Sequence, residues 1–343
     1  MEMSQRKKEI LSAVIEQYVK TGEPVGSKLI MEMLPFSVSS ATIRNEMSDL
    51  TTMGYLTQPH TSAGRVPTQE GYRFYIDNLM DENEPDEDEK RQIRMGIGSN
   101  IGDPEELLER AGEMLASLTN CATVATTPTD SFAAVKRVEL VPVGSRIAMI
   151  VLMTTTGIIK NTVCKTDVPI TEKMIDIFNR TVENEFIGQP VADIGMAMIQ
   201  TLVASLGDMA LAMSPLFVAF SDLASQAAQA EIRLEGRQNL LNHREFSTGA
   251  YEMLDFLADD DKLGRVVSSG DENLRVVIGR ENMFRQLENS SIIISKYSVQ
   301  GHSGGSIGII GPTRIDYKRL IPRLKYISKL VGDLLTDTLE SEE

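Results

Sequence analysis

The chain has 343 residues, enough for two or three domains with their own cores, and its 42% hydrophobic content without tryptophan indicates a soluble protein with an aliphatic interior. No apolar run reaches the roughly 18 residues of a membrane span, no signal peptide is visible, and Cys121 and Cys164 lack metal-ligand spacing, so we expect a cytoplasmic protein. The net charge of −15 argues against a nucleic-acid binder, but residues 1–80 hold eight Lys/Arg against nine Asp/Glu and can bind DNA if the cations share one face.

Residues 1–80 show helical spacing of apolar residues four times, with one strand-like pair before the last helix. The predicted elements are helices over 4–20, from the N-caps Ser27 and Ser39, and from the N-cap Thr68, and a two-stranded wing over 55–67. Three helices, a hairpin and a closing helix in about 75 residues are typical of a winged helix-turn-helix domain.

The third of these helices has one apolar and one polar face. Ile43, Met47 and Leu50 recur at helical spacing and should pack on the first two helices. The opposite face carries short hydroxyls and the two side chains suited to guanine and adenine: Ser40, Thr42, Arg44, Asn45 and Ser48. Glu46 and Asp49 do not suit a phosphate-facing surface, so we expect them to point towards the first helix or solvent. This helix is therefore predicted to read the major groove.

The wing tip is polar as well. It holds His60, Thr61, Ser62 and Arg65, and we expect His60, Ser62 and Arg65 to contact the DNA backbone or minor groove. A winged helix used for protein contacts is the alternative interpretation at this point. Any one of these helices taken alone would more often be a solvated face, so the prediction depends on the combination of elements.

Beyond residue 80 the sequence predicts an α+β architecture. Residues 81–89, DENEPDEDE, contain seven acids and no apolar residue, which predicts a solvated linker or a frayed helix end. A helix and several strands follow, then a helical block from 171 to about 257, then strands again and a closing helix over about 316–339. This order indicates one α+β domain interrupted by an insertion. Pro322 is expected to kink or split the closing helix.

No constellation in the sequence indicates an enzyme, a metal or a cofactor. The glycine-rich segment 301–314 lacks the Gly-Lys-Ser/Thr ending of a phosphate loop, so its glycines are expected to permit close packing in a sheet rather than to cradle a ligand. The three histidines are scattered at 60, 243 and 302. The basic residues of the closing helix are expected to form a solvated face. The alternative is a docking surface for an acidic partner or for the chain's own acidic linker.

Four stretches carry a resemblance to a known family. EPVGSKLI, VSSATIRNEMSDL, QPHTSAGRVPTQEGYRFYID and the late GSIGIIGPTRIDY closely resemble the bacterial heat-inducible transcription repressors of chaperone operons. The similarity is strongest over residues 5–80 and returns near 137–160 and 304–320.

The resemblance implies an organisation and a set of partners. It implies a winged helix-turn-helix at 1–80, an acidic linker at 81–99, a GAF-like domain from 100–168 and 268–343, and a mainly helical dimerisation domain inserted at 169–267. It implies a homodimer on a double-stranded inverted-repeat operator, released on heat stress and modulated by a chaperonin. Heat could act by unfolding or through the chaperonin, and a GAF-like domain that senses a small molecule is the alternative function.

Overall fold

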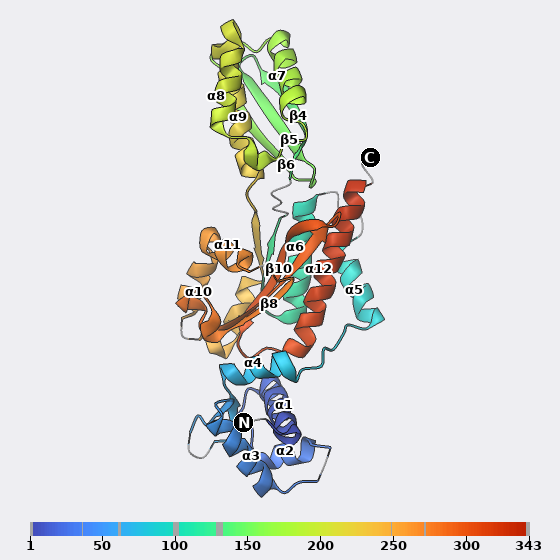
Figure 1. Ribbon diagram of the computed structural model, residues 1–343, viewed down its shortest axis with the longest axis vertical. Helices are drawn as coiled ribbons and strands as arrows, with labels where there is room; N and C mark the ends of the chain where they lie inside the picture. Colours follow the sequence, from blue (N-terminus) through green and yellow to red (C-terminus); the bar gives the residue numbers. More distant parts are fainter. Residues whose placement is uncertain are drawn as a thin grey trace.

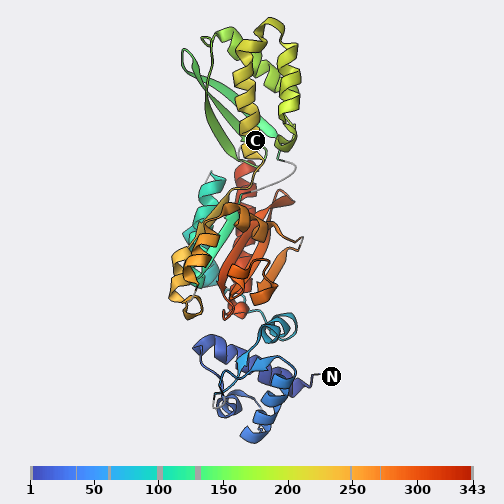
Figure 2. The same cartoon turned by 90° about the vertical axis from the view of Figure 1, so that its left-hand side faces the viewer.

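The computed structural model describes residues 3–35, 37–60, 63–98, 103–127, 133–247, 249–270 and 272–340. The molecule is elongated, with three bodies stacked along its longest axis (Figures 1 and 2). The N-terminal domain lies at one end, a central α+β body follows, and an inserted domain lies at the opposite end. An α+β multidomain architecture, as the sequence predicted, is confirmed.

The N-terminal domain, here called the head, has the predicted order of elements. It contains α1 (Gln5–Thr21), α2 (Ser27–Met33), α3 (Ser40–Thr52), β1 (Leu56–Thr57), β2 (Val66–Pro67) and α4 (Gln69–Asn78). The hydroxyls of Ser39 and Thr68 accept hydrogen bonds from backbone N–H groups two or three residues into α3 and α4, which confirms both predicted N-caps. The N-cap of α2 is Gly26 rather than Ser27, which begins the helix.

The central body is built on a five-stranded antiparallel sheet in the order β7-β3-β10-β9-β8. Its strands are β3 (Ala122–Thr126), β7 (Ile232–Glu235), β8 (Leu274–Ile278), β9 (Ser290–Val299) and β10 (His302–Pro312). One face packs on α6 (Pro104–Thr119) and α12 (Tyr317–Glu340), and α5 (Glu87–Ile97) packs on α6. The other face packs on α10 (Ala250–Leu257) and α11 (Asp260–Ser268), with short 3-10 turns over Arg237–Asn242 and Arg244–Phe246.

Four glycines of the segment 301–314 lie in β10, within this sheet: Gly304, Gly305, Gly308 and Gly311. A side chain at Gly305 would place its Cβ 2.5 Å from the carbonyl oxygen of Thr126, and one at Gly311 would lie 2.6 Å from the Cys121 sulfur. The expectation that these glycines permit close packing in a sheet is confirmed.

The inserted domain has its own sheet and core. It comprises β4 (Val135–Gly144), β5 (Ile147–Thr154), β6 (Ile159–Lys165), α7 (Glu172–Glu185), α8 (Met196–Ser205) and α9 (Ala210–Ala227). Among the described residues β4, β5 and β6 pair in one three-stranded sheet, and their inner face packs on the helices in a separate buried cluster. The domain thus combines three helices, which hold most of its regular structure, with a three-stranded sheet.

This arrangement corrects the boundaries expected from sequence. Strands within 100–168 were expected to belong to the central domain, yet those from 135 onward pair among themselves, so the insertion spans about 133–228. Residues 229–267, expected in the insertion, supply β7, α10 and α11 to the central body. Sequence patterns identify a strand but not its neighbour in a sheet, and this is why both boundaries were displaced.

Helix α9 is strongly apolar. With the preceding turn it forms a stretch, Gly207–Ala227, long and apolar enough by length and composition to cross a membrane. Leu216, Phe217 and Phe220 of this helix are nevertheless fully buried against α7 and the three-stranded sheet. Its apolar character is accounted for by its place in the core of the insertion.

The acidic segment is mostly exposed, as expected of a solvated linker, but it is also bound to α12. Arg323, only 4% exposed, donates to both carboxylate oxygens of Glu89 at 2.6 and 2.5 Å, and Lys325 bonds Glu82. Residues from Glu87 onward also form α5, whose Ile93 and Ile97 are buried. Basic residues of the closing helix therefore bind the chain's own acidic linker, which was one of the alternatives to a solvated face.

Helix α12 is not split at Pro322. A proline has no N–H to donate to the carbonyl four residues earlier, here that of Lys318. The backbone N–H of Asn83 in the acidic segment donates to this carbonyl oxygen at 3.0 Å. The segment thus supplies the hydrogen bond that Pro322 cannot, and the helix runs from Tyr317 to Glu340 as one element.

Arg323→Ala should lower the free energy of unfolding by about 3 kcal/mol, because it removes the buried cation of the largely buried Glu89 carboxylate and leaves only the exposed Arg319, 3.8 Å away. Lys329→Ala, an exposed position on the same helix, is the matched control and should change it by less than about 0.5 kcal/mol. Urea titration of the full chain measures both. Equal urea midpoints for the two variants would show that the Arg323–Glu89 pair does not hold the acidic segment against α12.

Candidate nucleic-acid interface

One side of α3 is fixed against α1. Ile43, Met47 and Leu50 are buried in the head core. Glu46 bonds Arg6, with the Arg6 Nε 2.8 Å from its Oε1, and Lys7 lies 2.9 Å from Asp49 and 3.4 Å from Glu46. The hydrogen bond to Asp49 is the largest cause that raises the pKa of Lys7, so the ammonium stays charged. Both acids point to the first helix, as expected from the sequence.

The other side of α3 is exposed. Arg44, Asn45 and Ser48 lie there, and their side chains bond no other residue in the described part of the chain. Their polar groups are therefore available to a ligand. Two of these three side chains, Arg44 and Asn45, can form bidentate contacts with guanine and adenine edges.

The two remaining predicted residues of α3 have structural contacts. The Ser40 hydroxyl lies 3.0 Å from the Ser27 hydroxyl and joins the N-termini of α3 and α2, while the Thr42 hydroxyl lies 2.9 Å from that of Ser39. Each is half-buried. A hydroxyl can donate and accept at once, so these contacts limit but do not remove the capacity of Ser40 and Thr42 to bind phosphate.

The wing is a two-residue antiparallel pair that is braced against the rest of the head. Arg65 exchanges two backbone hydrogen bonds with Val25, both at 2.9 Å, and its Nε donates to the Thr51 hydroxyl at the end of α3 at 3.0 Å. Arg65 thus holds the wing against α3. His60 is exposed at the tip, and Thr61 and Ser62 lie outside the described residues.

Lys28 is a cation that the sequence reasoning did not select. It is exposed in the first turn of α2, next to Ser27, whose hydroxyl meets Ser40 at the N-terminus of α3. The Ser27–Ser40 contact therefore places Lys28 near the N-terminus of α3. In the sequence, Lys28 could have been selected because it directly follows Ser27, the predicted N-cap of the second helix.

Comparisons with known proteins agree with this geometry. A family described as "Winged helix-turn-helix transcription repressor, HrcA DNA-binding" matches residues 2–79, and one described as "HrcA protein C terminal domain" matches residues 105–321. Curated relatives include the heat-inducible transcription repressors HrcA of Acetivibrio thermocellus, 35% identical with 95% of each chain covered, and of Caldanaerobacter subterraneus, 34% identical with 100% of each covered. That of Clostridium tetani is 35% identical over 98% of this chain and 97% of its own.

A solved structure shows a similar fold. The crystal structure of a hypothetical protein matches with a TM-score of 0.66 at 25% identity, covering 98% of this chain and 100% of the other.

The wing depends on Gly64. A Cβ at this position would lie 2.4 Å from the carbonyl oxygen of Val25, a backbone atom that cannot rotate away. Gly64→Ala should therefore displace the wing and destabilise the head by about 1–3 kcal/mol, a typical range for overpacking. Gly144→Ala is the control, because a Cβ there would meet only the Ile147 Cβ, at an ordinary contact distance of 3.8 Å. Differential scanning calorimetry of the full chain should show a lower melting temperature for Gly64→Ala alone; identical traces would contradict the close approach.

Proposed function

The chain belongs to the HrcA family of heat-inducible transcription repressors, and from that premise we propose that it represses chaperone operons by binding an inverted-repeat operator as a cytoplasmic homodimer, associated with the nucleoid when bound. The observation that carries the proposal is the exposed face of α3, where Arg44, Asn45 and Ser48 have no partner among the described residues. Catalysis forms no part of this proposal.

The proposed contacts divide into those that read sequence and those that position the protein. Arg44 and Asn45 meet base edges in the major groove, while Ser40, Thr42 and Ser48 meet bases or phosphates. Lys28 meets a phosphate beside them. In the wing His60, Ser62 and Arg65 face the backbone or minor groove, with Arg65 contributing mainly through its bond to Thr51.

The outer face of the insertion sheet supports dimerisation. Val141, Met149 and Val163 are register partners across β4, β5 and β6, and Ile147 and Ile159 lie on the same face. Val163 is 64% exposed and Ile159 52% exposed. An exposed apolar sheet face of this kind is typical of a surface that a second copy covers.

The proposal for heat release follows from marginal stability. Warming reduces the folded, dimeric fraction and so the occupancy of the operator. A chaperonin that refolds the repressor would raise that fraction, and the exposed Met196, Met198 and Leu211 of the insertion offer apolar surface for such a partner. Recovery of operator binding when chaperonin and ATP are added to heat-inactivated protein would support this modulation; no recovery would leave intrinsic stability as the sensor.

Fluorescence anisotropy tests the central proposal. The full-length protein is titrated against an inverted-repeat duplex selected from random-sequence DNA and against a scrambled duplex, each at two salt concentrations. Phosphate contacts weaken with salt on both, so the difference between the duplexes reports base reading. Affinity at least about a thousandfold tighter for the selected duplex supports a sequence-specific repressor, and equal affinity contradicts it.

Arg44→Ala should relax sequence preference more than it weakens binding. Loss of a bidentate base contact costs about 1–3 kcal/mol on the selected duplex and little on scrambled DNA. Lys28→Ala is the comparison variant, because a lost phosphate contact should weaken both duplexes alike. The same titration measures both variants. Equal weakening of Arg44→Ala on the two duplexes would remove its base-reading role.

Val163→Glu should convert the dimer to a monomer, because it places an unpaired carboxylate in an apolar interface. Leu211→Glu is the control, since Leu211 is 90% exposed at the start of α9, away from the outer face of the sheet. Size-exclusion chromatography with light scattering reads both. A Val163→Glu protein that stays dimeric would place the interface elsewhere.

A further inference from the structure

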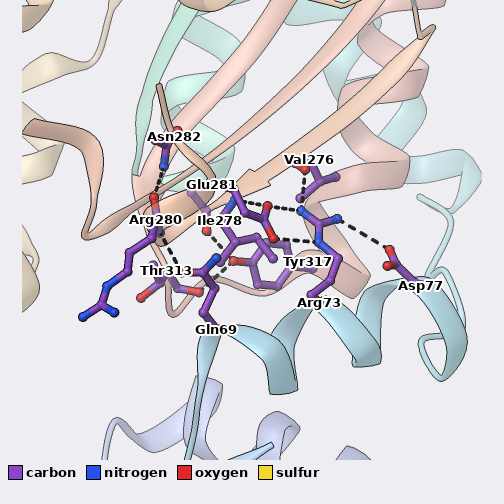
Figure 3. A network of polar contacts seen from close by, with 12 residues as sticks. Gln69, Arg73, Asp77, Val276, Ile278, Arg280, Glu281, Asn282, Thr313 and Tyr317 are labelled. Atoms are coloured by element: carbon purple, nitrogen blue, oxygen red, sulfur yellow. Dashed lines mark hydrogen bonds and ion pairs between the residues drawn. The ribbon is translucent and has the colours of Figure 1, made fainter. Parts of the chain in front are cut away.

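The head is fastened to the central body by an arginine of α4. Arg73 donates from Nε to Oε1 of Glu281 at 3.1 Å and from Nη2 to the carbonyl oxygen of Val276 at 2.6 Å (Figure 3). One turn earlier on α4, Gln69 accepts a hydrogen bond from the backbone N–H of Arg280 at 2.8 Å. Helix α4 is thus bonded to the end of β8 and to the 3-10 turn Gly279–Glu281.

The acceptor of this contact is itself held in place. Oε2 of Glu281 accepts the backbone N–H of Ile278 at 2.9 Å. Burial alone would raise the pKa of Glu281, but the hydrogen bonds from Arg73 and Ile278 hold that pKa below its usual value. The carboxylate therefore stays charged opposite the guanidinium at neutral pH.

A second arginine fastens the head from the opposite direction. Arg314 of the central body donates from Nη1 to the carbonyl oxygen of Val19 at 2.9 Å and from Nε to Glu245 at 2.7 Å. Val19 lies in the last turn of α1, where backbone carbonyls have no partner within the helix. Each body thus supplies one arginine that satisfies a backbone carbonyl of the other.

The two contacts enclose an apolar junction. The rings of Tyr72 in α4 and Tyr317 in α12 lie with centroids 5.8 Å apart, and both side chains are buried. A single cluster of buried residues runs from the head core through these rings into the central body. Domains joined by small polar contacts are expected to move relative to one another. This junction instead resists such motion.

We propose that Arg73 and Arg314 are positioning residues that set the angle of the head on the body and thereby select operators by the spacing of their half-sites. The inference rests on the proposed dimeric repressor. A dimer of helix-turn-helix heads fits half-sites one turn of DNA, or multiples of it, apart. Heads fixed on the body cannot follow a changed spacing, whereas heads on a free joint can.

The test compares three proteins on three duplexes. The proteins are full-length wild type, Arg73→Ala/Arg314→Ala, and the control Asp77→Ala/Arg280→Ala. Asp77 pairs with Arg73 only within α4, at 3.5 Å, and the exposed Arg280 guanidinium points away from the junction in Figure 3. The duplexes are the selected inverted repeat, the same repeat with its spacer lengthened by about five base pairs, half a turn of DNA, and a single half-site.

The expected result is a change in spacing preference alone. Wild type and control should lose at least about a hundredfold in affinity on the lengthened spacer, because only one head can then engage. The double variant should lose less than about tenfold, and all three proteins should bind the single half-site alike.

Other outcomes distinguish a failure of the positioning role from a failure of the proposed dimeric repressor. A double variant that keeps the wild-type spacing preference overturns the positioning role. Wild type that binds the inverted repeat no tighter than the half-site overturns the dimeric repressor instead. If the double variant loses half-site binding through misfolding of the head, Glu281→Ala/Arg314→Ala decides, because both changes lie in the central body and leave the sequence of the head intact. A relaxed preference supports positioning, and an unchanged one overturns it.

Discussion

The buried pair between Arg323 and Glu89 fixes the course of the chain between the head and the central body. Breaking one partner of such a pair is costly, because it leaves a charge away from water. With this contact in place, Asn83 lies where its N–H can replace the hydrogen bond that Pro322 removes from α12. The N-terminal part of α12 then stays helical, and Tyr317 and Arg314 at its start meet the head. One ion pair thus supports the side of the junction that α12 supplies.

Charge in the head is arranged so that an acidic protein can still present a DNA-binding face. Glu46 and Asp49 belong to α3, yet Arg6 and Lys7 of α1 pair with them on the side away from the exposed polar face. The acids therefore stabilise the packing of α3 on α1 instead of repelling phosphate. The surplus of negative charge lies beyond residue 80, and part of it is neutralised by α12 through Glu82 and Glu89.

Local patterns predicted what depends on local structure. Helical periodicity and N-cap residues located α3 and α4, and the two faces of α3 followed from spacing alone. Contacts between distant parts of the chain were not accessible in this way. The Ser27 hydroxyl that binds Ser40, the Thr51 hydroxyl that binds Arg65 and the Glu89 that binds Arg323 are set by the fold. The same holds for β4. Its strand character is visible in the sequence, but the sequence does not show that it pairs with β5 rather than with β3.

The proposed dimer face and the proposed DNA-reading face lie in domains at opposite ends of the long axis, with the central body between them (Figure 1). A small rotation at either joint becomes a large displacement of α3. The joint of the insertion is also stiffened: Lys160 of β6 bonds Glu105 and Glu231, and Arg233 bonds the same two carboxylates. The two segments that connect the insertion to the central body are also hydrogen-bonded to each other, because the N–H of Thr127 donates to the carbonyl oxygen of Glu231 at 3.0 Å. A network of shared carboxylates holds its angle better than one pair, because each side chain is already ordered by its neighbours. Stiffness at both joints is what would let a dimer interface at one end fix the separation of two recognition helices at the other.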